Sequence, residues 1–275
     1  MARMKFMNTE IDNLTMGEAL QTVDQLIQKN KCSYVVTPNI DHIVQLEINK
    51  ELQNIYADAS LILTDGKPLL WIAKWYGTPI KEKISGSDLF PLLCEMAAQK
   101  SYKMYFLGAA EGIAAKAAEN LSRRIVGLNV VGTYSPPYGF ESDSIEMEKI
   151  KSQIREARPD ILIVGLGCPK QEKFMYYHCK ELGVPISFGL GASFDFEAGN
   201  IKRAPRWMAD HGLEWLYRII QDPKRLAKRY LVDDMKILRM AVKYKPPKIQ
   251  GGGTKFSSSF GILFLQSGGI ICRIG

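Results

Sequence analysis

An acidic residue at the end of a short apolar run is the first candidate for chemistry. Asp65 follows Leu61–Leu63 and precedes Gly66, whose missing side chain lets a ligand or another backbone segment approach closely. Partial removal from water would raise the pKa of this carboxyl toward the value that a general base needs. The alternative is structural, because Asp is a common N-cap and a helix could begin near Lys67-Pro68.

Other polar or small residues also follow apolar runs. Thr37 and Asn39 enclose a proline and supply a hydroxyl and an amide suited to orienting a sugar or a phosphate, although turn chemistry explains them equally well. Residues 165–171 include Gly167 and Gln171, and the backbone N–H groups of this loop could meet a phosphate at a helix start. The loop matches neither Walker A nor Gly-x-Gly-x-x-Gly, so alone it is a weak signal.

Three further residues are candidates, and two of them have both a functional and a structural interpretation. Gly108 could admit a nucleotide base or could form a tight turn. Lys83 precedes a glycine-containing turn, where it would be a phosphate clamp if the loop folds over a cleft and a solvated cation otherwise. Asp195 follows the end of another apolar run.

These residues need a scaffold that gathers them, and the sequence predicts one. Short β-branched or aromatic runs alternate with stretches of helical period, which is typical of an α/β domain with a mainly parallel sheet of about six strands and helices on both faces. The carboxyl ends of parallel strands share one edge, so the loops above should line one cleft. The predicted strands are Ser33–Thr37, Leu61–Thr64, Tyr102–Leu107, Asn129–Thr133, Ile161–Gly165 and Ile186–Leu190.

Helices are predicted between these strands, and a short extended pair before them. Thr15 and Glu18 form a capping-box pattern that predicts a helix near Thr15–Lys29, after an extended pair in Lys5–Leu14. The other predicted helices are Ile40–Ala57, Glu111–Ile125, Asp143–Ala157, Gln171–Leu182 and a basic stretch from Glu214 to Tyr244, broken at Asp222-Pro223.

The charge of the chain is uneven along its length. Residues 1–201 carry 21 Lys and Arg against 24 Asp and Glu, whereas residues 202–248 carry 13 against 5 and residues 249–275 carry 2 against none. We therefore predict an α/β catalytic domain over 1–201, a basic helical appendage over 202–248 that docks on an anionic membrane, and a disordered tail over 249–275.

Composition excludes several classes of protein. With 46% hydrophobic and 24% charged residues the chain is an ordinary globular protein, and no apolar run approaches the roughly 20 residues of a membrane span. The N-terminus lacks the pattern of a secretory signal, so we expect a cytoplasmic protein. Five cysteines without a Cys-x-x-Cys pair indicate reduced thiols, and the three scattered histidines give no metal motif, so no metal or other cofactor is predicted.

The motifs taken in order resemble the WecG/TagA/CpsF family of bacterial glycosyltransferases over about residues 1–245. The motifs that carry this resemblance are Thr37-Pro38-Asn39, Thr64-Asp65-Gly66, Glu82-Lys83-Ile84-Ser85-Gly86-Ser87-Asp88, Leu107-Gly108-Ala109, Gly165-Leu166-Gly167-Cys168-Pro169-Lys170-Gln171-Glu172-Lys173, Gly191-Ala192-Ser193-Phe194-Asp195, Lys202-Arg203-Ala204-Pro205 and Gly212-Leu213-Glu214-Trp215-Leu216-Tyr217-Arg218.

The resemblance implies an inverting, metal-independent transfer of a sugar from a UDP-sugar, for instance UDP-N-acetylmannosamine, to a polyprenyl-diphosphate-linked saccharide. Such an enzyme builds wall or surface polymers, including teichoic acid, at the inner face of the cell membrane.

The resemblance also implies roles for single residues. Asp65 would be the general base, and Thr37, Asn39 and Gln171 would orient the sugars and the diphosphate. Arg218 and Arg225 match family arginines proposed to meet the charge on departing UDP. Two positions depart from the pattern, since Lys83 stands where many members have Arg and another family arginine falls on Lys228.

A nucleotide-dependent oxidoreductase on a Rossmann-like fold is the alternative function. Against it stands the absence of Gly-x-Gly-x-x-Gly with an acid placed after it. No nucleic-acid partner is expected, because the body of the chain is acidic and no aromatic–basic RNA motif is present. The donor sugar, the acceptor saccharide and self-association into a homo-oligomer stay open.

Overall fold

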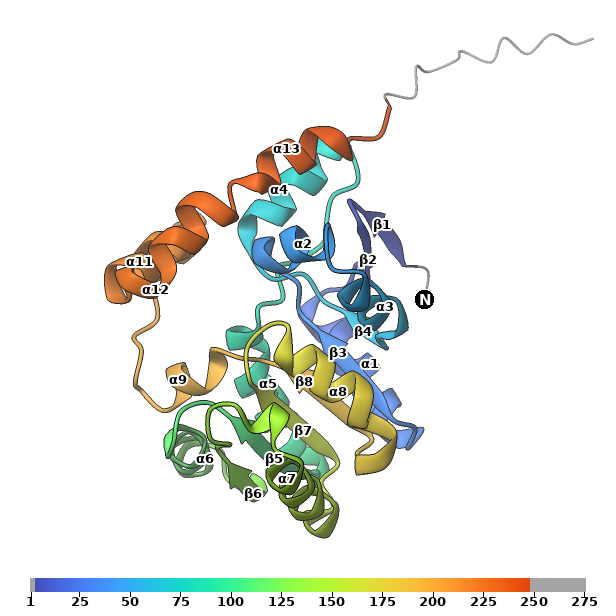
Figure 1. Cartoon of the computed structure of the whole chain (residues 1–275), viewed down its shortest axis with the longest axis vertical. Coiled ribbons are helices and arrows are strands. Elements are labelled where there is room, and N and C mark those ends of the chain that lie inside the picture. The colour runs from blue at the N-terminus through green and yellow to red at the C-terminus, as the bar shows by residue number, and fades with distance from the viewer. Residues whose placement is uncertain (1–2, 248–275) are drawn as a thin grey trace, which may run out of the picture. The chain divides into compact units, whose positions relative to one another are not determined.

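The protein is an α/β domain built on a six-stranded parallel sheet (Figure 1). The computed structural model describes residues 3–247, apart from the side chains of Arg206, Asp210 and Arg225. The strand order is β4-β3-β8-β7-β5-β6. The strands are β3 (Ser33–Val36), β4 (Leu61–Ile62), β5 (Lys103–Gly108), β6 (Asn129–Tyr134), β7 (Ile161–Gly165) and β8 (Ile186–Gly189).

Helices cover both faces of this sheet. The helices of the α/β body are α1 (Met16–Gln28), α2 (Ile40–Leu46), α3 (Lys50–Asp58), α4 (Lys67–Tyr76), α5 (Gly86–Lys100), α6 (Ile113–Arg124), α7 (Ser144–Ala157), α8 (Lys170–Leu182) and α9 (Ser193–Glu197), with a 3-10 turn η1 (Phe140–Ser142). A two-stranded antiparallel sheet of β1 (Met4–Phe6) and β2 (Thr9–Ile11) precedes them.

Alternation along the strands divides the interior into two cores. In β3, Tyr34 and Val36 belong to the core shared with α2, α3 and α8, whereas Val35 belongs to the core shared with α1, α5 and α6. Successive side chains of a strand point to opposite faces, so a strand buried on both sides must be apolar throughout. This is why the strands appear in the sequence as short continuous apolar runs.

The segment after residue 205 consists of short helices. These are α10 (Arg206–Asp210), α11 (Glu214–Gln221), α12 (Pro223–Lys228), the π-helix η2 (Arg229–Asp233) and α13 (Lys236–Lys243). The described chain from Arg3 to Lys245 forms one compact unit. The proposed boundary between residues 201 and 202 stays a prediction, and the predicted tail over 249–275 lies outside the described residues.

The predicted fold class is confirmed: all six predicted strands are present in one parallel sheet, with helices around it. The capping box of Thr15 and Glu18 is also present at the start of α1. The single helix predicted over Ile40–Ala57 is wrong, because the side chain of Asn49 caps the new helix α3 and divides the segment. The long helix α5 is absent from the sequence prediction.

The prediction that all five cysteines are reduced is wrong for one pair. The structure joins Cys32 to Cys179 in a disulfide, with Cα atoms 5.8 Å apart and 147 positions apart in sequence. The spacing rules search for cysteines close together in the chain, so they could not identify a pair that only the packing of α8 against β3 brings together.

Candidate functional site

Asp65 lies where β4 leads into α4, at the carboxyl edge of the sheet. Its backbone N–H donates to the carbonyl oxygen of Pro38 at 2.9 Å, which joins the loop after β4 to the loop after β3. The N-cap of α4 is Gly66, with φ of 102° and no side-chain capping bond. Asp65 therefore does not cap this helix, and the structural alternative considered for its carboxylate is wrong.

The surroundings of Asp65 favour a base that works near neutral pH. Burial, followed by the charge of Glu214, raises the pKa of its carboxyl to about 6, although Lys83, Arg218 and His42 act in the opposite direction. The side chain is half-buried rather than enclosed. A carboxylate with this pKa is mostly ionised at pH 7 and remains basic enough to accept a proton from an approaching hydroxyl.

Lys83 and Arg218 are the two described residues with a permanent positive charge that lower the pKa of this carboxyl. Lys83 Nζ lies 3.0 Å from Asp88 Oδ2, while the guanidinium of Arg218 lies over the Phe196 ring, 5.1 Å from its centroid. Burial alone would lower the pKa of Arg218, but Tyr230, Glu214 and Asp65 raise it, so the cation is kept.

The other cation inferred for the appendage is Arg225, whose side chain lies outside the described residues.

Thr37 and Asn39 hold the loop after β3. Thr37 is buried, and its hydroxyl donates to the carbonyl oxygen of Gly189 in β8 at 3.4 Å. Asn39 is the N-cap of α2, and its Oδ1 accepts from the backbone N–H of His42 at 3.4 Å. Both residues therefore have structural bonds, and both stand at the sheet edge that also carries Asp65.

Gln171 is buried in the first turn of α8, directly after the glycine loop. Its Nε2 donates to Glu172 Oε1 at 2.8 Å, while its Oε1 has no hydrogen-bond partner. A Cβ atom at Gly191 would lie 3.1 Å from that Oε1, so the loop after β8 leaves room for the amide. Gly167 has a φ of 77°, and a Cβ atom there would meet nothing within 4 Å.

Gly108 and Asp195 have structural explanations. A Cβ atom on Gly108 would lie 2.4 Å from the carbonyl oxygen of Gly165, so close packing of β5 against β7 requires this glycine. Asp195 Oδ1 accepts from Asn200 Nδ2 at 2.9 Å within the turn that follows α9. Neither residue has a hydrogen bond or ion pair to Asp65 among the described contacts.

Sequence reasoning missed the group that joins Asn39 to Gln171. His42 and Glu172 are buried, and His42 Nε2 lies 3.4 Å from Glu172 Oε1. Within residues 3–247, His42, Glu172 and Cys168 are also the one set of three potential metal ligands, with ligand atoms within 4.8 Å of one another. The available signal was the position of His42 three residues after Asn39 and of Glu172 next to Gln171.

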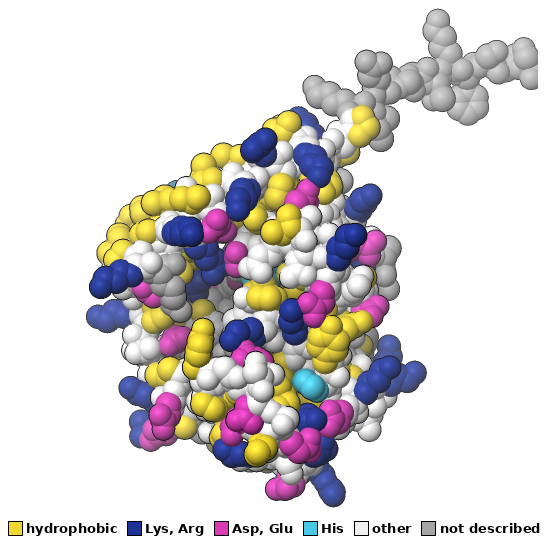
Figure 2. All heavy atoms as spheres, in the orientation of Figure 1, with side chains coloured by type: hydrophobic (Ala, Val, Ile, Leu, Met, Phe, Trp, Pro, Cys, Tyr) yellow, Lys and Arg dark blue, Asp and Glu magenta, His cyan; other side chains and the backbone are white. Residues whose placement is uncertain are grey.

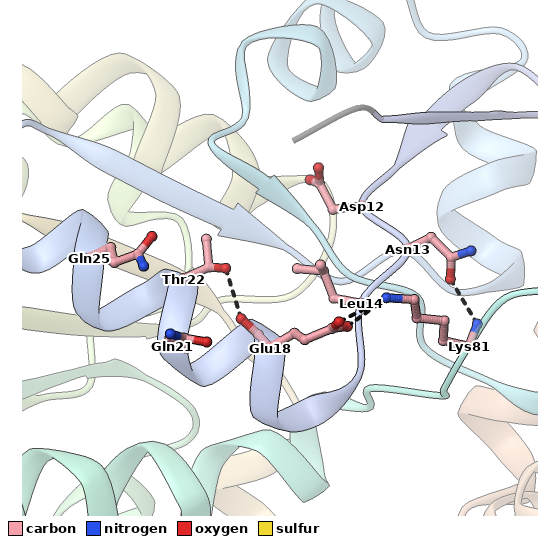
Figure 3. A pocket seen from close by; sticks show the side chains of 8 residues that line it. All are labelled: Asp12, Asn13, Leu14, Glu18, Gln21, Thr22, Gln25 and Lys81. Atoms are coloured by element: carbon pink, nitrogen blue, oxygen red, sulfur yellow. Dashed lines mark hydrogen bonds and ion pairs between the residues drawn. The ribbon is translucent and has the colours of Figure 1, made fainter.

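The surface has a hollow beside the C-terminal helices and a separate cavity at the start of α1. In the space-filling view the surface is hollowed between the α11–α12 segment and α2 (Figure 2). A separate cavity of about 450 Å³ lies at the start of α1, where Lys81 Nζ contacts Glu18 (Figure 3). None of the residues lining that cavity belongs to the candidate site.

A carboxylate at the carboxyl edge of a parallel sheet, with two cations that act on it, is compatible with group-transfer chemistry. The model of the glycosyl transferase WecG/TagA/CpsF family matches residues 4–250, so the chain belongs to this family and is a glycosyltransferase. Membership selects glycosyl transfer over the oxidoreductase alternative. The resemblance inferred from the ordered motifs is confirmed.

The chain is similar to curated enzymes that share one printed name, N-acetylglucosaminyldiphosphoundecaprenol N-acetyl-beta-D-mannosaminyltransferase. A relative from Bacillus spizizenii is 31% identical over 81% of this chain and 83% of its own length. One from Bacillus subtilis is 32% identical over 64% and 67%, and one from Staphylococcus aureus (strain MW2) is 24% identical over 82% and 88%. Among the described residues, each helix is too short or too polar to cross a bilayer.

Proposed function

We propose that this glycosyltransferase transfers N-acetylmannosamine from its UDP derivative to an N-acetylglucosaminyl-diphosphate-linked polyprenol, with inversion and without a metal ion. The observation that carries the proposal is the state of Asp65, a half-buried carboxylate with a pKa of about 6. The positive charges of Lys83 and Arg218 both act on this carboxylate. The names of the relatives support this choice of donor sugar and acceptor. The product would enter wall or surface polymers such as teichoic acid.

In the proposed reaction Asp65 takes the proton of the acceptor hydroxyl. The hydroxyl oxygen then forms a bond to the anomeric carbon while the bond from that carbon to the UDP oxygen breaks on the opposite face. UDP leaves with the electron pair of the broken bond, and the proton stays on Asp65 until solvent removes it. Attack opposite the leaving group inverts the configuration.

Charge on departing UDP must be met by the protein if no metal takes part. We assign this role to Lys83 and Arg218, because both act on the Asp65 carboxyl, and to Arg225 by family resemblance alone. Cations already fixed before the reaction stabilise developing charge without the cost of reorganising solvent. The Arg218 guanidinium is held in this way by Phe196 and Tyr230.

A UDP-release assay tests the donor, the acceptor and the metal requirement together. The full chain is incubated with a short-chain N-acetylglucosaminyl-diphosphate lipid and a panel of UDP-sugars, each with and without EDTA. We expect release above background with UDP-N-acetylmannosamine, dependent on acceptor and unchanged by EDTA. Preference for a different UDP-sugar would refute the donor, and strong inhibition by EDTA would refute the metal-free reaction.

The C-terminal helices carry the proposed membrane contact on the cytoplasmic side. Large apolar side chains are exposed on η2 and α13, including Leu238 at 58% and Val242 at 69% exposure, beside Arg239 and Lys243. Figure 2 shows hydrophobic and basic side chains together along this edge of the molecule. Each basic residue near an anionic lipid surface contributes about 1 kcal/mol, so several of them give peripheral binding without insertion.

Vesicle sedimentation tests this contact. Replacing Leu238 and Val242 together by Asp should reduce binding to vesicles of phosphatidylglycerol and phosphatidylcholine, because both changes remove apolar area and add repulsion. The matched control is Ile145→Asp on α7, since Ile145 is 82% exposed but lies on a less basic helix. Equal binding of both variants and the unaltered protein would refute the contact.

A further inference from the structure

Four side chains form a chain of contacts between the N-cap of α2, which is Asn39, and the first turn of α8, which carries Gln171. His42 Nδ1 lies 2.8 Å from Asn39 Oδ1, and His42 Nε2 lies 3.4 Å from Glu172 Oε1. The Nε2 of Gln171 donates to the same Glu172 oxygen at 2.8 Å. The contacts therefore run from α2, through the two central residues, to α8.

The two central residues are buried, and they contact each other. His42 is 7% exposed and Glu172 is 1% exposed. His42 Nδ1 accepts from the backbone N–H of Asn39 at 3.3 Å, so Nε2 is the ring nitrogen that donates, and Glu172 Oε1 is its acceptor.

The hydrogen bonds of His42 and Glu172 decide which end of each amide faces these two residues. A carboxylate oxygen only accepts, so the amino end of Gln171 must face Glu172 and its Oε1 must point the other way. That Oε1 is buried and has no partner. Asn39 Oδ1 accepts from the backbone N–H of His42 and lies 2.8 Å from His42 Nδ1, so the oxygen end of Asn39 faces His42 and its Nδ2 lies on the opposite side of the amide.

We infer that His42 and Glu172 are positioning residues that orient the Asn39 and Gln171 amides, so that a bound sugar meets a donor at Asn39 and an acceptor at Gln171. The inference rests on the proposed function, because it assigns the ligand of these amides to the sugar substrate. The acceptor at Gln171 requires a substrate group with a hydrogen, which is a sugar hydroxyl or the N–H of an acetamido group. A buried acceptor left without such a group weakens binding, so this contact discriminates between sugars.

A double-mutant cycle separates positioning from a merely structural role. The variants are Glu172→Gln, Gln171→Met and the pair, with Glu181→Gln as the matched control because Glu181 is an exposed acid of the same helix. Glu172→Gln is nearly isosteric and lets the Gln171 amide turn over. We expect it to lower kcat/KM for the UDP-sugar about tenfold, and to lower it less than twofold in the Gln171→Met background.

The ratio of kcat/KM for two epimeric UDP-N-acetylhexosamines gives a second readout. Glu172→Gln should move this ratio toward one, whereas a fold defect would lower both values together. Equal losses of kcat/KM in both backgrounds with an unchanged ratio would overturn the inference. If Glu172→Gln does not fold, the cycle of His42→Gln with Asn39→Ser applies the same criteria, since Ser keeps the N-cap of α2.

Two controls separate the inference from neighbouring explanations. Failure of the unaltered enzyme to turn over any UDP-sugar counts against the proposed function, whereas equal losses in an active enzyme count against the positioning role alone. His42, Glu172 and Cys168 also have the donor types of a zinc site. Absence of zinc binding to chelator-treated enzyme supports the positioning role, and one tightly bound equivalent that changes turnover overturns it.

Discussion

Replacing Asp65 by Asn should lower turnover by orders of magnitude and at the same time stabilise the protein at neutral pH. Asn keeps the shape of the protonated carboxyl and cannot take the acceptor proton. Loss of a positioned general base lowers kcat by about 10²–10⁴-fold. The gain in stability has a separate origin, because the fold raises the pKa of Asp65 and so disfavours its charged form.

The size and sign of this gain follow from the pKa. Raising a carboxyl pKa from 3.8 to about 6 corresponds to about 3 kcal/mol. The side chain is half-buried, so solvent screening reduces this to about 1–2 kcal/mol. The folded state is favoured while Asp65 is protonated, and this contribution is lost as the pH rises from about 4 through 6. The Asn variant escapes that loss, so its advantage should be full above pH 7 and absent below pH 4.

Thermal unfolding at pH 4 and pH 8, with UDP release measured at the same temperature, tests both parts. We expect a melting temperature about 3–6 °C above that of the unaltered protein at pH 8 and no difference at pH 4. Asp234, whose pKa is also raised to about 6, is common to both proteins and cancels in the comparison. In the unaltered enzyme kcat/KM should rise with pH up to about 6. An Asn variant with turnover close to that of the unaltered enzyme, or one less stable at pH 8, would refute the reasoning.

Three further substitutions have defined outcomes. Gly108→Ala places a Cβ atom 2.4 Å from a backbone oxygen of the neighbouring strand, so urea unfolding should show a loss of about 2–4 kcal/mol, against about 1 kcal/mol for the control Gly139→Ala, whose Cβ atom would meet nothing within 4 Å. Lys83→Met should lower kcat about 10²-fold in the UDP-release assay, whereas Lys83→Arg should stay within tenfold of the unaltered enzyme, and equal rates for both would contradict a charge role. Gly189→Ala places a Cβ atom 2.8 Å from Gln171 Nε2 and should lower kcat/KM about 10–100-fold without unfolding the protein; an unchanged value would show that the Gln171 amide is not used.

The sequence determined the sheet and the edge at which we expect the chemistry. Short apolar runs flanked by Gly, Pro and Asn predicted all six strands, because a strand buried on both faces leaves a local pattern. The loops after these runs named Asp65, Thr37, Asn39 and Gln171 as candidates. Their roles in the reaction stay predictions that the experiments above test.

Tertiary structure alone decided how these candidates meet. Glu172 and His42 lie 130 positions apart, and no local pattern states that a carboxylate in α8 faces an imidazole in α2. The influence of Glu214 on Asp65 and the disulfide of Cys32 with Cys179 are likewise long-range. Hydrophobic periodicity acts over a few residues, whereas desolvation and charge depend on distance in space. The pKa of Asp65 and the directions of the two amides therefore follow from packing rather than from the local sequence.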